Sequence, residues 1–141
     1  MFAQLVLGSA LVCLTIFITV GFIAIASATL TRNGQWLISG NPFVRLMVSL
    51  SGIVLWLLAA LSISVWVWAG AFLVLGQFET LEEAVYFSVV SFTTLGFGDV
   101  VIGKDWRLLS GIIAANGLIL FSLVTAYLIE FIVRLRGARA E

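Results

Sequence analysis

Three long apolar stretches dominate this sequence. Residues 5–30 and 46–76 contain no charged side chain, and the stretch from 108 to 133 contains only Glu130. A helix crosses the hydrocarbon core of a bilayer in about 20 residues, so each stretch can form one crossing. The chain is 62% hydrophobic and has seven basic and seven acidic residues, too few to cover a soluble domain. We therefore expect an all-α membrane protein with three transmembrane helices.

The first apolar stretch has a rival interpretation as a signal peptide, because Ala26-Ser27-Ala28 resembles a cleavage site. No basic residue precedes the stretch, and it is longer than an ordinary signal-peptide core. We therefore expect residues 1–45 to form a retained transmembrane helix followed by a cytoplasmic linker.

The second helix is expected to begin at Pro42, with Asn41 as its N-cap. The uncharged stretch from 46 to 76 corresponds to about 46 Å of helix, which predicts a tilted or protruding crossing. Trp66 and Trp68 lie near its far end, where an aromatic belt is expected at the membrane interface.

The segment between the second and third crossings is different in kind. Glu79, Glu82 and Glu83 are charged, and the apolar run after them is too short to cross a membrane. Thr80 with Glu83 fits a capping box, which predicts a short helix over 81–92 that re-enters the membrane. Non-helical backbone at membrane depth is tolerated only where it is buried in protein or lines a water-filled space. The sequence thus indicates either a pore or a packed re-entrant loop.

The segment Thr93-Thr94-Leu95-Gly96-Phe97-Gly98-Asp99 follows this short helix. Its two glycines allow backbone dihedrals that most residues avoid, so that successive carbonyl groups can point the same way. Four such segments around an axis would form rings of carbonyl oxygens that replace the water around a dehydrated potassium ion.

The stretch from Tyr86 to Asp99 resembles the pore loop of bacterial potassium channels and of two-pore-domain potassium channels. The resemblance covers roughly residues 50–134. We expect a pore module over residues 46–134 and a short cytoplasmic tail over 135–141. It implies ion sites at the carbonyls of Thr94, Leu95, Gly96 and Phe97, with the Thr94 hydroxyl at the inner end. The supporting positions that it implies are Thr93, Gly98, Asp99 and Tyr86.

This chain departs from the family's usual filter in having Leu95 and Phe97 where valine and tyrosine are common. Phe97 cannot donate a hydroxyl hydrogen bond, and its expected aromatic partner, Phe87, has no polar group either. We expect Leu95 and Phe97 to pack the filter against the short helix. Asp99 is expected to accept a hydrogen bond from Tyr86 and to concentrate cations at the outer mouth. A solvated loop aspartate is the alternative.

The segment Leu120–Ala126 resembles the inner helix of pore-only bacterial channels, and this register places Gly117 at the family's hinge glycine. A bend or a close packing contact would each explain a glycine within a helix. Helical spacing aligns a stripe that we assign to the cavity and a possible gate: Leu118, Phe121, Thr125 and Ile129. On the opposite face, Asn116, Tyr127 and Glu130 are expected to contact other helices, and Arg134 is the expected ion-pair partner of Glu130.

The distribution of charge predicts the orientation. The break at 31–45 and the C-terminal tail hold five of the seven basic residues, whereas 79–105 hold five of the seven acidic ones. Basic loops favour the cytoplasmic side. We therefore expect a multi-pass protein of a cell membrane, most consistent with a bacterial plasma membrane, whose N-terminus lies outside and whose C-terminus is cytoplasmic.

These features together predict a potassium-selective channel, assembled as a homotetramer because one loop per chain cannot enclose a four-fold pore. A weakly selective cation channel of the same fold, and a non-conducting scaffold or sensor subunit, are the alternatives. We expect no cofactor besides the permeant K⁺, no nucleic-acid partner and no enzymatic activity. The chain has no histidine and one cysteine, Cys13, which excludes a disulfide or a Cys/His metal site within one chain.

Overall fold

The computed structural model describes residues 1–32 and 42–137. This part of the chain forms the α-helices α1 (Phe2–Arg32), α3 (Pro42–Val74), α4 (Leu81–Phe92) and α5 (Leu108–Gly137), with a short 3₁₀ turn, η1 (Lys104–Trp106), before α5. Three segments are long and apolar enough to cross a membrane: Phe2–Thr29, Met47–Val74 and Lys104–Arg134. The prediction of three crossing helices is confirmed.

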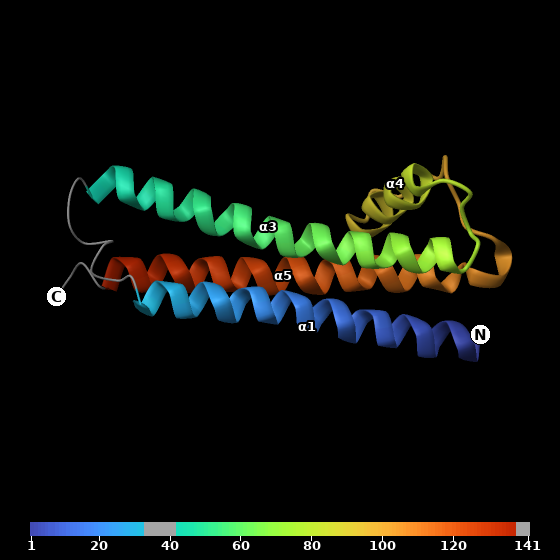
Figure 1. Ribbon diagram of the computed structural model, residues 1–141, viewed down its shortest axis with the longest axis horizontal. Coiled ribbons are helices and arrows are strands. Elements are labelled where there is room, and N and C mark those ends of the chain that lie inside the picture. Colours follow the sequence, from blue (N-terminus) through green and yellow to red (C-terminus); the bar gives the residue numbers. More distant parts are fainter. Residues whose placement is uncertain (33–41, 138–141) are drawn as a thin grey trace.

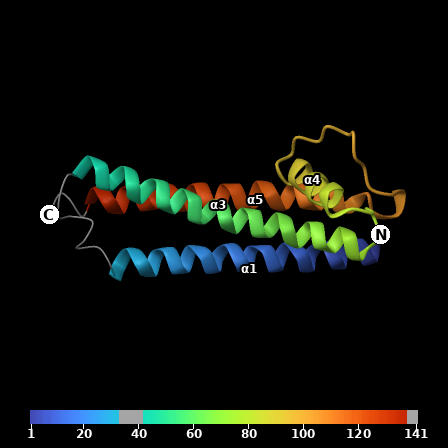
Figure 2. The same cartoon turned by 45° about the horizontal axis from the view of Figure 1, so that its top comes forward.

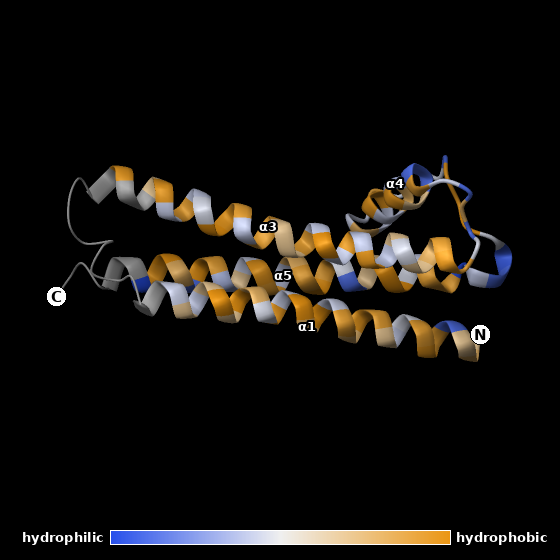
Figure 3. Ribbon diagram, in the orientation of Figure 1, coloured by the Kyte–Doolittle hydropathy of each residue, from blue (hydrophilic) through white to orange (hydrophobic). Residues whose placement is uncertain are grey.

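The three long helices lie side by side, and the short helix α4 lies near one end of the bundle, against α3 and α5 (Figures 1 and 2). The amino end of α1 is at this same end, and the carboxyl end of α5 is at the other. Figure 3 shows that hydrophilic residues concentrate in the segments that flank α4, whereas the long helices are mostly hydrophobic. Helices that are apolar all round are typical of membrane spans.

Helix α3 begins at Pro42, as predicted, while the expected cap at Asn41 lies outside the described residues. It ends at a Schellman motif, in which Gly76 has a φ of +65°. The Gly76 N–H donates to the Leu73 carbonyl at 2.9 Å, and the Gln77 N–H donates to the Phe72 carbonyl at 3.0 Å. Glycine adopts this left-handed conformation without steric cost. The motif turns the chain directly from α3 toward α4.

Aromatic side chains attach α4 to the end of α3. The ring of Phe87 on α4 lies 5.2 Å from the rings of both Phe72 and Phe78, and Phe72 and Phe87 are buried. Edge-to-face and tilted contacts at this separation add to the hydrophobic burial of each ring. Phe87 therefore belongs to the core between α3 and α4.

The predicted aromatic belt is only half right. Trp66 is 53% exposed, as an interfacial residue should be, but Trp68 is fully buried with its ring 5.9 Å from that of Phe72. Two residues correspond to about 200° around a helix, so these side chains lie on opposite faces. Trp68 is a core residue because its face of α3 is the one covered by the rest of the bundle.

Candidate functional site

The amino end of α4 is capped by Thr80, whose hydroxyl oxygen accepts a hydrogen bond from the Glu83 N–H at 3.2 Å. Thr80 has extended backbone dihedrals, and Glu82 and Glu83 lie in the first turn. The cap satisfies one unpaired N–H group, and the carboxylates favour the positive end of the helix dipole. The predicted bounds of this helix, 81–92, and its threonine cap are confirmed.

The carboxyl end of α4 binds the backbone of the segment that follows it. The Thr94 N–H donates to the Ser91 carbonyl at 3.0 Å, and the N–H groups of Leu95 and Gly96 donate to the Val90 carbonyl at 3.0 and 3.3 Å. Thr93 donates from its backbone and its hydroxyl to the Val89 carbonyl. Four consecutive residues thus direct their N–H groups toward α4.

Left-handed dihedrals alternate along this segment. Thr94, Gly96 and Gly98 have φ values of +62°, +57° and +76°, whereas Leu95 and Phe97 have negative φ. Alternation of this kind rotates successive peptide planes so that their carbonyl groups can share one side. Glycine tolerates positive φ, but a β-branched residue does so only under strain. Glycine spacing predicted the conformation of Gly96 and Gly98, whereas that of Thr94 was missed.

The carbonyl oxygens of this segment are free to meet a ligand. In the described part of the chain, no hydrogen bond reaches the carbonyls of residues 94–97. The side chains of Leu95 and Phe97 are 60% and 67% exposed. More than half of each side chain is therefore left uncovered by the described part of its own chain, and the expected packing of both against the short helix stays a prediction.

Beyond the glycines, the Tyr86 hydroxyl donates a hydrogen bond of 2.7 Å to Asp99 Oδ2, which confirms the predicted pair. This bond stabilises the carboxylate and lowers the pKa of Asp99, and it raises the pKa of Tyr86, which must stay protonated to donate. The bond connects the middle of α4 to the far end of the glycine segment, whose near end is bound to the Val90 carbonyl.

The return segment after Asp99 is fixed by Gln77, a contact that the sequence analysis did not anticipate. Gln77 Oε1 accepts a hydrogen bond from the Gly103 N–H at 3.1 Å, and Gln77 Nε2 donates to the Leu75 carbonyl at 3.0 Å. The side chain thereby connects the turn after α3 with the turn before α5. A polar residue next to the helix-ending Gly76 was the only signal available for it.

Gly117 on α5 packs against the carboxyl end of α4. A β-carbon at this position would lie 1.9 Å from the carbonyl oxygen of Phe92 and 2.9 Å from its carbonyl carbon. Of the two roles considered for this glycine, the close packing contact is the one observed. A hinge at Gly117 stays a prediction.

The stripe assigned to the cavity lies on a largely exposed face of α5, on which the Phe121 ring also lies 5.6 Å from that of Phe92 at the end of α4. Leu118, Phe121 and Ile129 are 57%, 38% and 60% exposed, and Thr125 is exposed as well. Their common exposure on one chain is consistent with a face that lines a space between subunits. Their role in a cavity or a gate stays a prediction.

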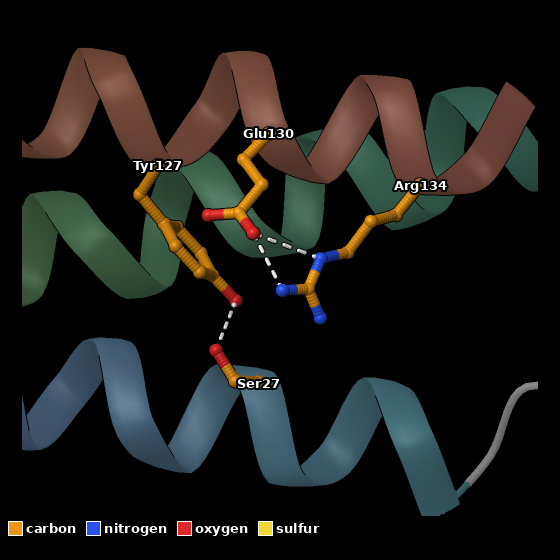
Figure 4. Close-up of polar contacts among 4 residues, drawn as sticks. All are labelled: Ser27, Tyr127, Glu130 and Arg134. Carbon is orange, nitrogen blue, oxygen red and sulfur yellow. Dashed lines mark hydrogen bonds and ion pairs between the residues drawn. The ribbon is translucent and has the colours of Figure 1, made fainter. Parts of the chain in front are cut away.

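The opposite face of α5 contacts α1, as expected for Asn116 and Tyr127. Asn116 Nδ2 donates to Thr15 Oγ1 at 2.8 Å, and the Ser27 hydroxyl donates to the Tyr127 hydroxyl at 3.2 Å. Figure 4 shows Tyr127 reaching across to Ser27, beside the ion pair of Glu130 and Arg134. In that pair Arg134 Nε donates to Glu130 Oε1 at 3.0 Å, which confirms the predicted partnership.

A family model described as ion channel matches residues 60–134, more than half of the chain. The chain therefore belongs to an ion-channel family. No curated protein and no solved structure is significantly similar to it. The matched residues run from the middle of α3 through α4 and the glycine segment to Arg134 on α5, so they include every residue of the candidate site. With its three crossing helices the protein is a multi-pass membrane protein, and its family supports ion conduction rather than enzymatic catalysis.

Proposed function

We propose that this protein is the pore subunit of a potassium-selective channel, in which Thr94, Leu95, Gly96 and Phe97 form the ion-binding filter. The observation that carries the proposal is the alternation of left-handed residues at Thr94, Gly96 and Gly98, directly after a helix whose carbonyls bind the N–H groups of residues 93–96. Among the residues that the structure describes, this backbone leaves the four successive carbonyls of residues 94–97 without hydrogen-bond donors, as a site for a dehydrated cation requires.

The chemistry of these ligands favours an alkali cation. Carbonyl oxygens are hard, neutral donors, so they replace the water around K⁺ without holding it as strongly as carboxylates would. The ion sites that we propose lie at the carbonyls of residues 94–97, with the Thr94 hydroxyl at the inner end. Asp99, whose pKa is lowered by its bond to Tyr86, adds negative charge at the outer end of this row and raises the local cation concentration.

A complete filter requires four copies of the chain. One glycine segment supplies one side of a carbonyl ring, and closed four-fold symmetry supplies the other three. The exposure of Leu95 and Phe97 supports assembly, because the described part of their own chain leaves more than half of each side chain uncovered and a neighbouring subunit would cover it. In this assembly α4 is a re-entrant pore helix, and the stripe of Leu118, Phe121, Thr125 and Ile129 faces a water-filled cavity.

The proposed orientation follows from the basic residues of the 31–45 break and of the C-terminal tail. The amino end of α1 and the glycine segment lie at one end of the bundle, and the carboxyl end of α5 lies at the other (Figure 1). Arg134 belongs to the last two turns of α5. Placing the basic end in the cytoplasm puts the filter at the outer side of a cell membrane.

The test is flux through liposomes that contain the purified protein, with potassium and sodium gradients in parallel. We expect flux in potassium, little in sodium, and block by barium. Gly96→Ala should abolish the preference because alanine resists a φ of +57°, whereas Gly70→Ala, in open space on α3, should not. Equal flux of both ions would favour a weakly selective cation channel, and a tetramer without flux would favour a scaffold; either result would overturn the proposal.

A further inference from the structure

A buried polar pair joins α1 to α5 near the middle of both membrane spans. Asn116 Nδ2 donates to Thr15 Oγ1 at 2.8 Å, and both side chains are fully buried. The Thr15 hydroxyl donates in turn to the carbonyls of Leu11 and Val12 in its own helix. Polar side chains at this depth are retained where they pair, and such a pair fixes the register of two helices.

The pair is not optimised for stability. In the described part of the chain, Asn116 Oδ1 is buried and accepts no hydrogen bond. An unpaired buried carbonyl oxygen is costly, so an apolar side chain of similar size would serve simple packing better. The asparagine therefore contributes something other than the stability of the helix pair.

The position of Asn116 in the chain indicates what it contributes. The next residue is Gly117, which lies directly against the carbonyl group of Phe92 at the end of α4. Thr94, the first residue of the glycine segment with a left-handed backbone conformation, lies two residues beyond Phe92. A rotation or a shift of α5 at Asn116 would thus move the surface that supports the base of the glycine segment.

Helix α1 is attached to α5 and to the segment before it along most of its length. Gln4 near its amino end donates a hydrogen bond to the Asp105 carbonyl in η1, and Ser27 near its carboxyl end bonds to Tyr127. Between them, a β-carbon on Gly8 would lie 2.6 Å from Ile112 Cδ1, so the two helices approach closely there. The pair of Thr15 and Asn116 is the buried hydrogen bond within this contact.

We propose that Thr15 and Asn116 are positioning residues for the ion filter: α1 holds α5 at the rotation in which Gly117 supports the end of α4. The inference rests on the proposed function and gives the first helix a role in selectivity. Neither residue touches the permeant ion. Both act through the contact of Gly117 with Phe92.

A matched pair of substitutions tests this role in the full-length protein. Thr15→Val removes the hydroxyl that binds Asn116. Thr19→Val removes an equally buried hydroxyl from the same face of α1, but that hydroxyl donates to the Thr15 carbonyl of its own helix. Thr15→Ser keeps the hydroxyl, and Asn116→Leu removes the same bond from the other helix. The readouts are the potassium-to-sodium flux ratio in liposomes and the thermal stability of the tetramer.

We expect Thr15→Val and Asn116→Leu to lower the flux ratio roughly 3- to 10-fold, the equilibrium equivalent of one interhelical hydrogen bond in a membrane. Thr19→Val and Thr15→Ser should keep the wild-type ratio. The double variant Thr15→Val/Asn116→Leu should be no worse than either single variant. Asn116→Leu should retain thermal stability while selectivity falls, a combination that a purely structural role would not produce.

The opposite results are equally clear. If Thr15→Val matches Thr19→Val in flux ratio, or if stability falls while the ratio stays unchanged, the positioning role is wrong. Should Thr15→Val fail to assemble, Asn116→Leu tetramers of unchanged selectivity would also overturn it. Wild-type protein without a preference for potassium would instead refute the proposed function, and this inference with it.

Discussion

The Cα atom of Gly117 lies against the carbonyl group of Phe92, closer than any residue with a side chain would permit. This contact joins the middle of α5 to the residue at which α4 ends. Since α4 binds the N–H groups of the next four residues, α5 indirectly supports the whole glycine segment.

Gly117→Ala should therefore destabilise the protein, although alanine is the better helix former. Forcing a methyl group against backbone costs typically about 1–3 kcal/mol, because the end of α4 must move. Gly111→Ala in the same helix meets nothing within 4 Å and should be neutral or stabilising. Thermal unfolding of both purified variants measures the difference. Equal stability of the two variants would show that α4 does not rest on Gly117.

Tyr86→Phe should raise the pKa of Asp99 toward its ordinary value of 3.8, because the hydroxyl bond now lowers it. Because folding lowers the pKa of this carboxyl, its bond stabilises the native state fully at pH values above the ordinary pKa of 3.8. This stabilisation is lost as the pH falls through the lower pKa of the native state. The pKa of Tyr86 is raised, so its contribution to stability is complete below pH 10.0, its ordinary pKa, and is lost as the pH rises through the raised value.

The contribution of the Tyr86–Asp99 bond to stability should consequently be constant from about pH 5 to 9 and should weaken on either side of this range. NMR titration of the Asp99 carboxyl in wild type and in Tyr86→Phe measures the shift. Tyr127→Phe, which alters a tyrosine bonded to Ser27 instead, is the matched control. An Asp99 pKa that is the same in wild type and Tyr86→Phe would mean that the bond does not persist.

Phe97→Ser should weaken the proposed tetramer without altering the helices of one chain. The ring is 67% exposed within the chain, and covering a phenylalanine contributes roughly 1.5–3 kcal/mol per subunit. Val101→Ser changes a residue that is 71% exposed two positions beyond Asp99 and serves as the control. Cross-linking before and after heating measures assembly, and circular dichroism measures helix content. Equal loss of tetramer in both variants would exclude a specific contact of Phe97 between subunits.

Thr125→Cys should react with a water-soluble thiol reagent, because its face of α5 is expected to line a wet cavity. Leu120→Cys, at a fully buried position of the same helix, should react more slowly. For each unit by which burial raises the pKa of a thiol, the fraction present as the reactive thiolate falls about tenfold. The experiment requires Cys13→Ser as its background, since the native thiol is exposed. Faster modification at position 120 would place the cavity on the other face.

Local signals predicted the helices and much of the site. Thr80 and Glu83 define the start of α4, Gly96 and Gly98 define its continuation, and the apolar stretches define the long helices. These features are encoded within a few residues, so a single sequence is sufficient to find them. The bond between Tyr86 and Asp99 came from a family resemblance and is present, although its role at a filter stays a prediction.

Features that depend on which face is covered could not be read locally. Trp68 was predicted to lie at the membrane interface, but its face of α3 is covered by the bundle. The packing of Phe87 on Phe72 and Phe78 was likewise not predicted. The role of α1 was not assigned, because Thr15 gives no sign of its partner 101 residues away. Thr94 was missed for a different reason: β-branched residues avoid positive φ, and only the surrounding bonds hold it there.

The left-handed conformation of Thr94 has a consequence for how freely this position can vary. Glycine would relieve the backbone strain, but it would also remove the hydroxyl proposed for the inner end of the filter. Serine would keep the hydroxyl and lose the branch at the β-carbon. Under the proposed function, the residue at position 94 that is best for the stability of one subunit is therefore not the one that is best for ion binding. A screen for thermal stability alone would then select substitutions that conduct poorly.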